Sequence, residues 1–161
     1  MESILKETMI TVAKTEKIGV CSSSQATVII SLDNKFSLSL PGATYGFCAR
    51  FSDEERKAIF LEAQQYGTNR ISSLSQWLPI RDDIYPLYWG KDISQGERIR
   101  RHWKNNSNGT GLVRFCAYSN LKEKEIACVS LTVTEYEKLE FALQYRYKDL
   151  LKTSNRKLEK Q

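Results

Sequence analysis

Three short motifs that start α-helices divide this chain into alternating helical and strand-like stretches. In each motif a Ser or Thr is followed three residues later by Glu, so that the hydroxyl caps one free amide of the first helical turn and the carboxylate reaches back to another. The three pairs are Ser52 and Glu55, Ser94 and Glu97, and Thr134 and Glu137. Helices that begin here, with apolar segments between them, predict an α+β fold in which helices flank a small central mixed or antiparallel sheet.

The segments between these helix starts are rich in β-branched and aromatic residues, which is typical of strands. The first helix is expected to end at Tyr66-Gly67, and the second to run to about Lys104. Pro79 and Pro86 have no amide hydrogen and belong at a sheet edge or a bulge. The expected strands are residues 10–13, 26–32, 36–40, 45–51, 112–118 and 126–133, with a turn at residues 33–35 and a hairpin over residues 74–91.

Charge and composition limit the functional class. The chain has 161 residues, with 24 Lys and Arg against 19 Asp and Glu, a net charge of +5 that is densest over residues 146–161. Such an excess favours a polyanionic partner such as nucleic acid, or serves solubility. No apolar run approaches the roughly 18 residues of a membrane span, and we see neither a signal-peptide core nor a Cys-x-x-Cys pair. We expect a cytoplasmic protein with free thiols and no membrane partner.

The most specific stretch is Tyr88-Trp89-Gly90-Lys91, followed by Arg98 and His102. A strand is expected to end in an aromatic hydroxyl and a Gly-Lys pair, and then to turn into a capped helix. Arg98 and His102 lie four residues apart, so they share one helical face. An arginine offers a forked, permanent positive charge for phosphate, and the single histidine of the chain can exchange protons near neutral pH.

These residues resemble the second half of the motif of the GIY-YIG nuclease superfamily, in particular its restriction-endonuclease-like members with an N-terminal extension. In that family a Tyr-x-Gly-Lys motif ends a strand, a catalytic Arg follows ten residues after the Tyr, and a His or Tyr comes four residues later. The family also has a metal-binding Glu about forty residues beyond the Arg and an Asn after that helix. Glu140 and Asn155 are the matching positions, with Glu135 and Glu137 as alternatives to Glu140.

The resemblance implies a β-rich N-terminal arm with one helix over residues 1–74, a GIY-YIG-like nuclease core over residues 75–155 and a basic tail over residues 156–161. It implies hydrolysis of phosphodiester bonds in DNA, most simply a duplex, with Mg²⁺ or Mn²⁺ on Glu140. A tyrosine would orient or deprotonate the attacking water, His102 would take or share the proton, and Arg98 would stabilise the phosphoryl charge. The expected catalytic residues are Tyr88, Lys91, Arg98, His102 and Glu140, and the expected substrate-binding residues are Arg101, Lys152 and Asn155.

The first half of the family motif, Gly-Ile-Tyr, is not present as written. Hairpin spacing places Trp77 at its tyrosine position, and an indole cannot replace a phenol in proton transfer. Tyr66 or Tyr45 would fill the position if a helical insertion separates the two strands, as in some restriction enzymes of the family. The alternative function is a non-catalytic module that binds nucleic acid or protein on a nuclease-like scaffold, and a homodimer and a monomer both stay open.

Overall fold

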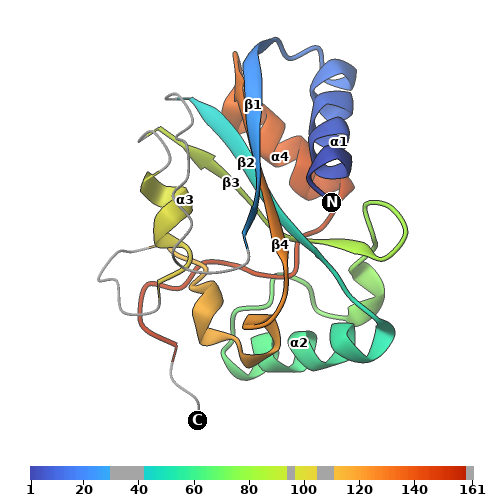
Figure 1. The fold of residues 1–161 in the computed structure, drawn as a ribbon, viewed down its shortest axis with the longest axis vertical. Helices are drawn as coiled ribbons and strands as arrows, with labels where there is room; N and C mark the ends of the chain where they lie inside the picture. Colours follow the sequence, from blue (N-terminus) through green and yellow to red (C-terminus); the bar gives the residue numbers. More distant parts are fainter. Residues whose placement is uncertain (30–41, 94–96, 105–110, 159–161) are drawn as a thin grey trace.

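The computed structural model describes residues 1–29, 42–93, 97–104 and 111–158 (Figure 1). This part of the chain forms an α+β fold with four α-helices and a four-stranded antiparallel sheet, as the coarse fold class predicted. None of the described helices is long and apolar enough to cross a membrane. In chain order the elements are α1 (Glu2–Thr15), β1 (Val20–Ile29), β2 (Ala43–Arg50), α2 (Asp53–Gln65), β3 (Ile84–Asp92), α3 (Glu97–Arg101), β4 (Ile126–Val133) and α4 (Tyr136–Arg146), with 3-10 turns at Leu74–Gln76, Phe115–Ala117 and Ser119–Leu121.

The strands lie in the order β1-β4-β2-β3, and every neighbouring pair is antiparallel. β2 comes from the segment expected as an N-terminal arm, yet it lies inside the sheet and pairs with both β3 and β4. Strands from both sides of the expected boundary at residue 74 therefore share one sheet. β3 lies at the edge, and α2 lies between β2 and β3 in the chain, so a helical insertion separates the two strands.

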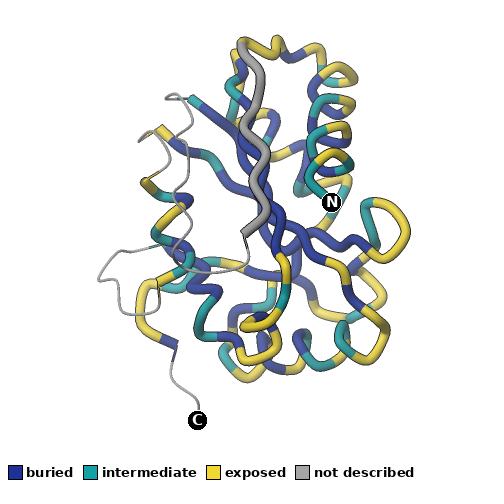
Figure 2. The backbone as a smooth tube through the Cα atoms, in the orientation of Figure 1, coloured by how far each residue is buried: buried dark blue, intermediate teal, exposed yellow. Residues whose placement is uncertain are grey.

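Strands β2, β3 and β4 are buried on both faces (Figure 2). α1 and α4 lie side by side on one face (Figure 1), where Met9 and Leu143 pack in a cluster with Trp89 of β3. The opposite face holds an aromatic cluster that includes Tyr45, Phe47 and Tyr88. Segments after α2, around α3 and before β4 cover this second face, and they bring polar groups to the edge strand.

The expected strand at residues 10–13 is wrong, because these residues belong to α1. Leu5, Met9 and Val12 recur at helical spacing and are all buried, so one apolar helical face outweighs the local strand composition. Strand β1 contains the first part of the expected strand 26–32, and β2 and β4 match expected strands closely. The expected turn at residues 33–35 and strand at residues 36–40 lie outside the described residues.

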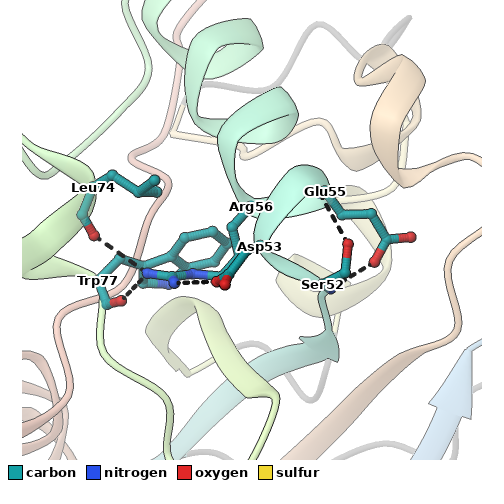
Figure 3. A network of polar contacts seen from close by, with 6 residues as sticks. All are labelled: Ser52, Asp53, Glu55, Arg56, Leu74 and Trp77. Carbon is teal, nitrogen blue, oxygen red and sulfur yellow. Dashed lines mark hydrogen bonds and ion pairs between the residues drawn. The ribbon is translucent and has the colours of Figure 1, made fainter.

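Of the three helix-start motifs, the first forms as predicted (Figure 3). The Ser52 hydroxyl accepts from the Glu55 amide, and the Glu55 carboxylate accepts from the Ser52 amide. The third does not form, because the Thr134 hydroxyl accepts from the amide of Gly19 and α4 begins after Glu135. Ser94 of the second lies outside the described residues, and α3 is shorter than expected, ending at Arg101.

The expected hairpin over residues 74–91 is wrong in its first half. A 3-10 turn at Leu74–Gln76 leads to buried Trp77, whose indole donates to the Pro86 carbonyl, and β3 pairs with β2 instead. Pro86 does lie at a bulge, as predicted. The expected strand at residues 112–118 is also wrong, since Arg114 has a left-handed backbone (φ 65°) that interrupts an extended run. Leu158, in the expected basic tail, is buried.

Candidate active site

Two tyrosines of the aromatic face lie on adjacent strands next to the β3 edge of the sheet. Tyr45 of β2 pairs in register with Gly90 of β3, and its ring centroid lies 6.2 Å from that of Tyr88. A Cβ on Gly90 would lie 2.5 Å from the Tyr45 ring and hydroxyl. The absence of a side chain at the glycine of the Tyr-x-Gly motif therefore leaves the space that the Tyr45 ring occupies beside Tyr88. We call the group formed by Tyr45, Tyr88, Arg98, His102 and Glu140 the β3-edge site.

His102 follows α3 and is fully buried against both tyrosines, with ring centroids 5.6 Å from Tyr45 and 5.0 Å from Tyr88. Its Nδ1 accepts from the amide of Val113 at 2.9 Å, and its Nε2 lies 2.6 Å from the Tyr45 hydroxyl. Burial, together with the charges of Arg98 and Arg101, lowers the pKa of His102 to about 3. The neutral ring must then carry its proton on Nε2, so His102 donates to Tyr45 and has no free nitrogen to take a proton, unlike the expected base.

Both tyrosine hydroxyls are protonated in the free protein at neutral pH. Burial is the main cause that raises the pKa of Tyr45 well above 10, and the charge of Tyr88 adds to it. Burial also raises the pKa of Tyr88, whereas the positive charges of Arg98 and Arg70 lower it. Tyr88 therefore has two cations that favour its phenolate.

Arg98 of α3 lies half-buried beside Tyr88. Burial by itself lowers the pKa of this guanidinium, but Coulombic attraction to Tyr45 and Tyr88 and a hydrogen bond with Tyr88 outweigh it and raise the pKa. One terminal nitrogen donates to the Gly111 carbonyl at 3.4 Å, and within the described residues the buried Nε has no hydrogen-bond partner. The arginine therefore keeps donor capacity for an anion.

Glu140 lies on α4, which covers the sheet face opposite to the aromatic cluster, and its charge acts on the pKa of Tyr88 and of Arg98 from there. Burial raises its pKa, while the charges of Lys91, Arg70 and Arg98 act in the opposite direction. The two alternative acids are engaged elsewhere. Glu137 pairs with the Lys91 ammonium at 2.5 Å. Glu135 occupies the N-cap position of α4 without a side-chain capping bond and lies 3.8 Å from Lys138. Lys91 is thus at the site, but it is neutralised by an exposed carboxylate.

The three expected substrate-binding residues have different surroundings. Asn155 accepts from the Gly111 amide at 2.9 Å, and the same glycine contacts Arg98, so Asn155 supports the β3-edge site from its border. Arg101 is half-exposed and acts on the pKa of His102. Lys152 is exposed, and its amide donates to the Thr68 carbonyl.

The structure distinguishes the three residues left open for the first tyrosine of the family motif. Trp77 packs against Phe51 at 5.3 Å between ring centroids, and Tyr66 packs against Tyr118 at 5.4 Å. Tyr45 contacts both Tyr88 and His102. Tyr45 is therefore the phenol that the fold places in the site.

Sequence reasoning missed one charged pair at this edge. Arg70 lies in the segment after α2, and Asp149 lies just beyond α4. The Arg70 Nε is 2.9 Å from a carboxylate oxygen of the fully buried Asp149, and its guanidinium lies 5.9 Å from the Tyr88 ring centroid. Neither residue belongs to a spacing motif. The one available signal was the acid of Asp149 beside the apolar pair Leu150-Leu151.

A hard divalent cation fits the chemistry of this edge. Mg²⁺ keeps several waters and is commonly held by one or two carboxylates plus substrate phosphate. Glu140 offers a half-buried carboxylate whose recorded hydrogen bond comes from Gln144 at 3.3 Å. The described residues contain no group of three or more His, Cys, Asp or Glu side chains that could hold a metal. Glu140 would therefore hold Mg²⁺ or Mn²⁺ together with water and phosphate oxygens.

Comparison with known proteins finds no match for this chain. No protein-family model, no curated protein and no solved structure matches the chain.

Proposed function

We propose that this chain is a metal-dependent endonuclease that hydrolyses phosphodiester bonds in duplex DNA at a GIY-YIG-like site. One observation carries the proposal, namely the convergence at the β3 edge. Residues 57 positions apart, Tyr45 and His102, share a 2.6 Å hydrogen bond, and Arg98 contacts Tyr88. The charge of Glu140 acts on both Tyr88 and Arg98.

In this proposal Tyr88 activates the attacking water. Burial holds the pKa of Tyr88 above its ordinary value of 10, and the charges of Arg98 and Arg70 oppose that rise, so Tyr88 releases its proton to solvent against the effect of burial and with the help of the two arginines. The phenolate then takes a proton from water while the new P–O bond forms and the bond to the leaving sugar oxygen breaks, and that oxygen takes a proton from solvent. Arg98 donates to the phosphoryl oxygens as charge builds on them. Glu140 would hold the divalent cation, which when bound would supply Lewis-acid stabilisation of the phosphate.

His102 and Tyr45 have a positioning role in this scheme. Because Nε2–H of His102 donates to the Tyr45 oxygen, the Tyr45 hydroxyl proton remains available for a second acceptor. A water or phosphate oxygen next to Tyr88 would be such an acceptor. The pair therefore orients the reactants and does not move the proton itself.

A second candidate is a non-catalytic module that binds nucleic acid. The observation that favours it is burial, since Tyr45 is 0% and Tyr88 only 4% exposed. Burial on this scale leaves the two hydroxyls little access to the water that a general base must activate. The two candidates differ in cleavage and agree on DNA binding.

The decisive experiment incubates supercoiled plasmid with the protein and Mg²⁺ or Mn²⁺ and follows conversion to open-circular or linear DNA. We expect cleavage by the wild type and none by Glu140→Gln, which keeps the size of the side chain and removes the charge that holds a hard cation. Gel-shift affinity of Glu140→Gln for the DNA should be retained or increased, because one carboxylate that repels phosphate is gone.

Glu137→Gln is the matched control, since Glu137 lies on the same helix and pairs with exposed Lys91. It should cleave at close to the wild-type rate. Full cleavage by Glu140→Gln would exclude Glu140 as the metal ligand. A wild type that binds the plasmid with either cation and leaves it intact would establish the binding module instead.

A further inference from the structure

Arg70 presents a partly open guanidinium at the β3-edge site. Its side chain is 35% exposed, and its Nε forms an ion pair with a carboxylate oxygen of Asp149 at 2.9 Å. Within the described residues that oxygen has no hydrogen-bond partner, so the contact is one of charge. Among the described residues, neither terminal nitrogen of Arg70 has a recorded hydrogen bond to the protein. Each terminal nitrogen of a guanidinium carries two of its five N–H donors. Most of the N–H donors of Arg70 therefore make no hydrogen bond to the described residues and can bind a ligand.

Asp149 fixes this arginine from the interior. One carboxylate oxygen accepts from the Trp89 amide at 2.9 Å, which satisfies an outward N–H of the edge strand, and the other faces Arg70. The Arg70 backbone is also held, because its amide donates to the Leu150 carbonyl at 2.6 Å. Both ends of the residue are thus anchored next to Tyr88.

We infer that Arg70 is a second phosphate-binding arginine of the β3-edge site, held in place by Asp149, and that it contacts a backbone phosphate of the bound nucleic acid. This inference rests on the proposed nucleic-acid substrate. A guanidinium with both terminal nitrogens free can bind two phosphate oxygens at once. Its nearness to Tyr88 places that phosphate beside the proposed reaction centre.

A purely structural role would need Arg70 only as the counter-charge of Asp149. The Nε contact alone fulfils that need, and it leaves unexplained why the guanidinium lies 5.9 Å from the Tyr88 ring centroid and acts on Glu140. The two roles predict different salt dependence. A phosphate contact releases condensed counterions from DNA, whereas an internal ion pair does not.

The test measures affinity for a fluorescent mixed-sequence DNA duplex as a function of salt, without divalent cation, so that cleavage is not required. For Arg70→Gln we expect the slope of log affinity against log salt to become shallower by about 0.9, and the affinity to fall about eightfold at 0.1 M salt. Arg81→Gln is the matched control, because Arg81 is exposed and paired with Glu7 on α1. It should leave the slope unchanged.

Arg70→Gln leaves Asp149 as a buried unpaired charge and can destabilise the fold. The double variant Arg70→Gln/Asp149→Asn removes both charges, and it should show the same shallower slope with a melting temperature close to that of the wild type. Asp149→Asn alone keeps the guanidinium, so it should keep the slope.

The outcomes separate this inference from the proposed function. If the wild type cleaves plasmid and both Arg70 variants keep the wild-type slope, the inference is overturned and the nuclease stands. If the wild type binds without cleaving and the slope changes, the nuclease is overturned and the phosphate contact stands. A wild type that does not bind the duplex overturns both.

Discussion

Two regions of this molecule place arginine against aromatic rings, and they differ in how fully the arginine is bonded. At the start of α2, Arg56 donates to Asp53 at 3.1 Å and to the Trp77 carbonyl at 2.8 Å (Figure 3). Its guanidinium also lies 4.3 Å from the Tyr85 ring centroid. At the β3-edge site, Arg98 has a 3.4 Å contact with a carbonyl and a contact with a tyrosine.

The difference indicates which arginine side chains stabilise the fold and which are available to a ligand. Arg56 joins α2 to the turn before β3 through groups that stay fixed in the folded protein. The β3-edge site instead gathers buried ionisable groups with displaced pKa values, namely His102, Tyr88 and Asp149. Such groups cluster at functional sites because burial and neighbouring charges are needed to tune reactive side chains.

Acid pH should act most strongly on the β3 edge, where two buried groups respond to it in opposite directions. The folded pKa of His102 is about 3 against an ordinary 6.5, so the unfolded chain binds the extra proton and stability falls as pH drops below 6.5. Asp149 acts in the opposite sense. Burial, against the opposing charge of Arg70, raises its pKa from 3.8 to about 7, so the folded chain binds the proton and stability rises as pH drops below 7.

In the wild type, the effects of His102 and Asp149 on the pH dependence of stability offset each other. A variant that lacks one of the two groups should show the effect of the other. In Asp149→Asn we expect the free energy of unfolding to fall by about 2 kcal/mol between pH 6.5 and pH 5, measured by urea denaturation. In His102→Asn, whose amide oxygen can still accept from Val113, the free energy should rise over the same interval. Parallel pH profiles for both variants would contradict the buried, neutral state of His102.

Exchange of arginine for lysine at each of the two regions tests which arginine affects the rate of cleavage. Arg98→Lys keeps the charge and loses the planar fork, so the single-turnover rate of plasmid cleavage should drop by about 100- to 1000-fold with little change in DNA affinity. Arg56→Lys should lower the melting temperature, because the carbonyls of Leu74 and Trp77 lose their donors. Its rate per folded molecule should stay at the wild-type level.

Loss of affinity in step with the rate in Arg98→Lys would make Arg98 a binding residue and favour the non-catalytic module. A drop in the rate of Arg56→Lys at a temperature where the protein is fully folded would mean that the start of α2 acts on the site. Either result would break the distinction between the two arginines.

Local chemistry determined the parts of the fold that could be predicted from the sequence. The Ser52 motif, strand β4 and the bulge at Pro86 depend on adjacent residues and appear as expected. The errors occur where distant contacts prevail. Thr134 bonds to Gly19, 115 residues away, instead of capping α4. Residues 10–13 join a helix because its apolar face packs on the sheet.

The site follows the same division. Spacing identified Tyr88, Arg98 and His102, which one strand and the following helix hold together. It left Tyr45 open beside Trp77 and Tyr66, since the helical insertion between β2 and β3 hides the strand pairing from a count along the chain. Arg70 and Asp149 meet through a contact 79 residues apart with no motif on either side. The role of His102 as a donor depends on the Val113 amide, which no pattern reveals.

The smallest expected effect concerns the cap of α2, and it tests whether that region contributes to stability alone. Ser52→Ala removes the hydroxyl that accepts from the Glu55 amide, which should cost about 1 kcal/mol. For a domain of this size we expect a fall of roughly 2–4 °C in melting temperature, with unchanged cleavage per folded molecule. Ser52→Asp keeps an acceptor at the helix start and should melt close to the wild type. If Ser52→Asp melts as low as Ser52→Ala, the hydroxyl acts through some contact other than the cap. If Ser52→Ala lowers cleavage while the protein stays folded, the start of α2 is coupled to the β3-edge site.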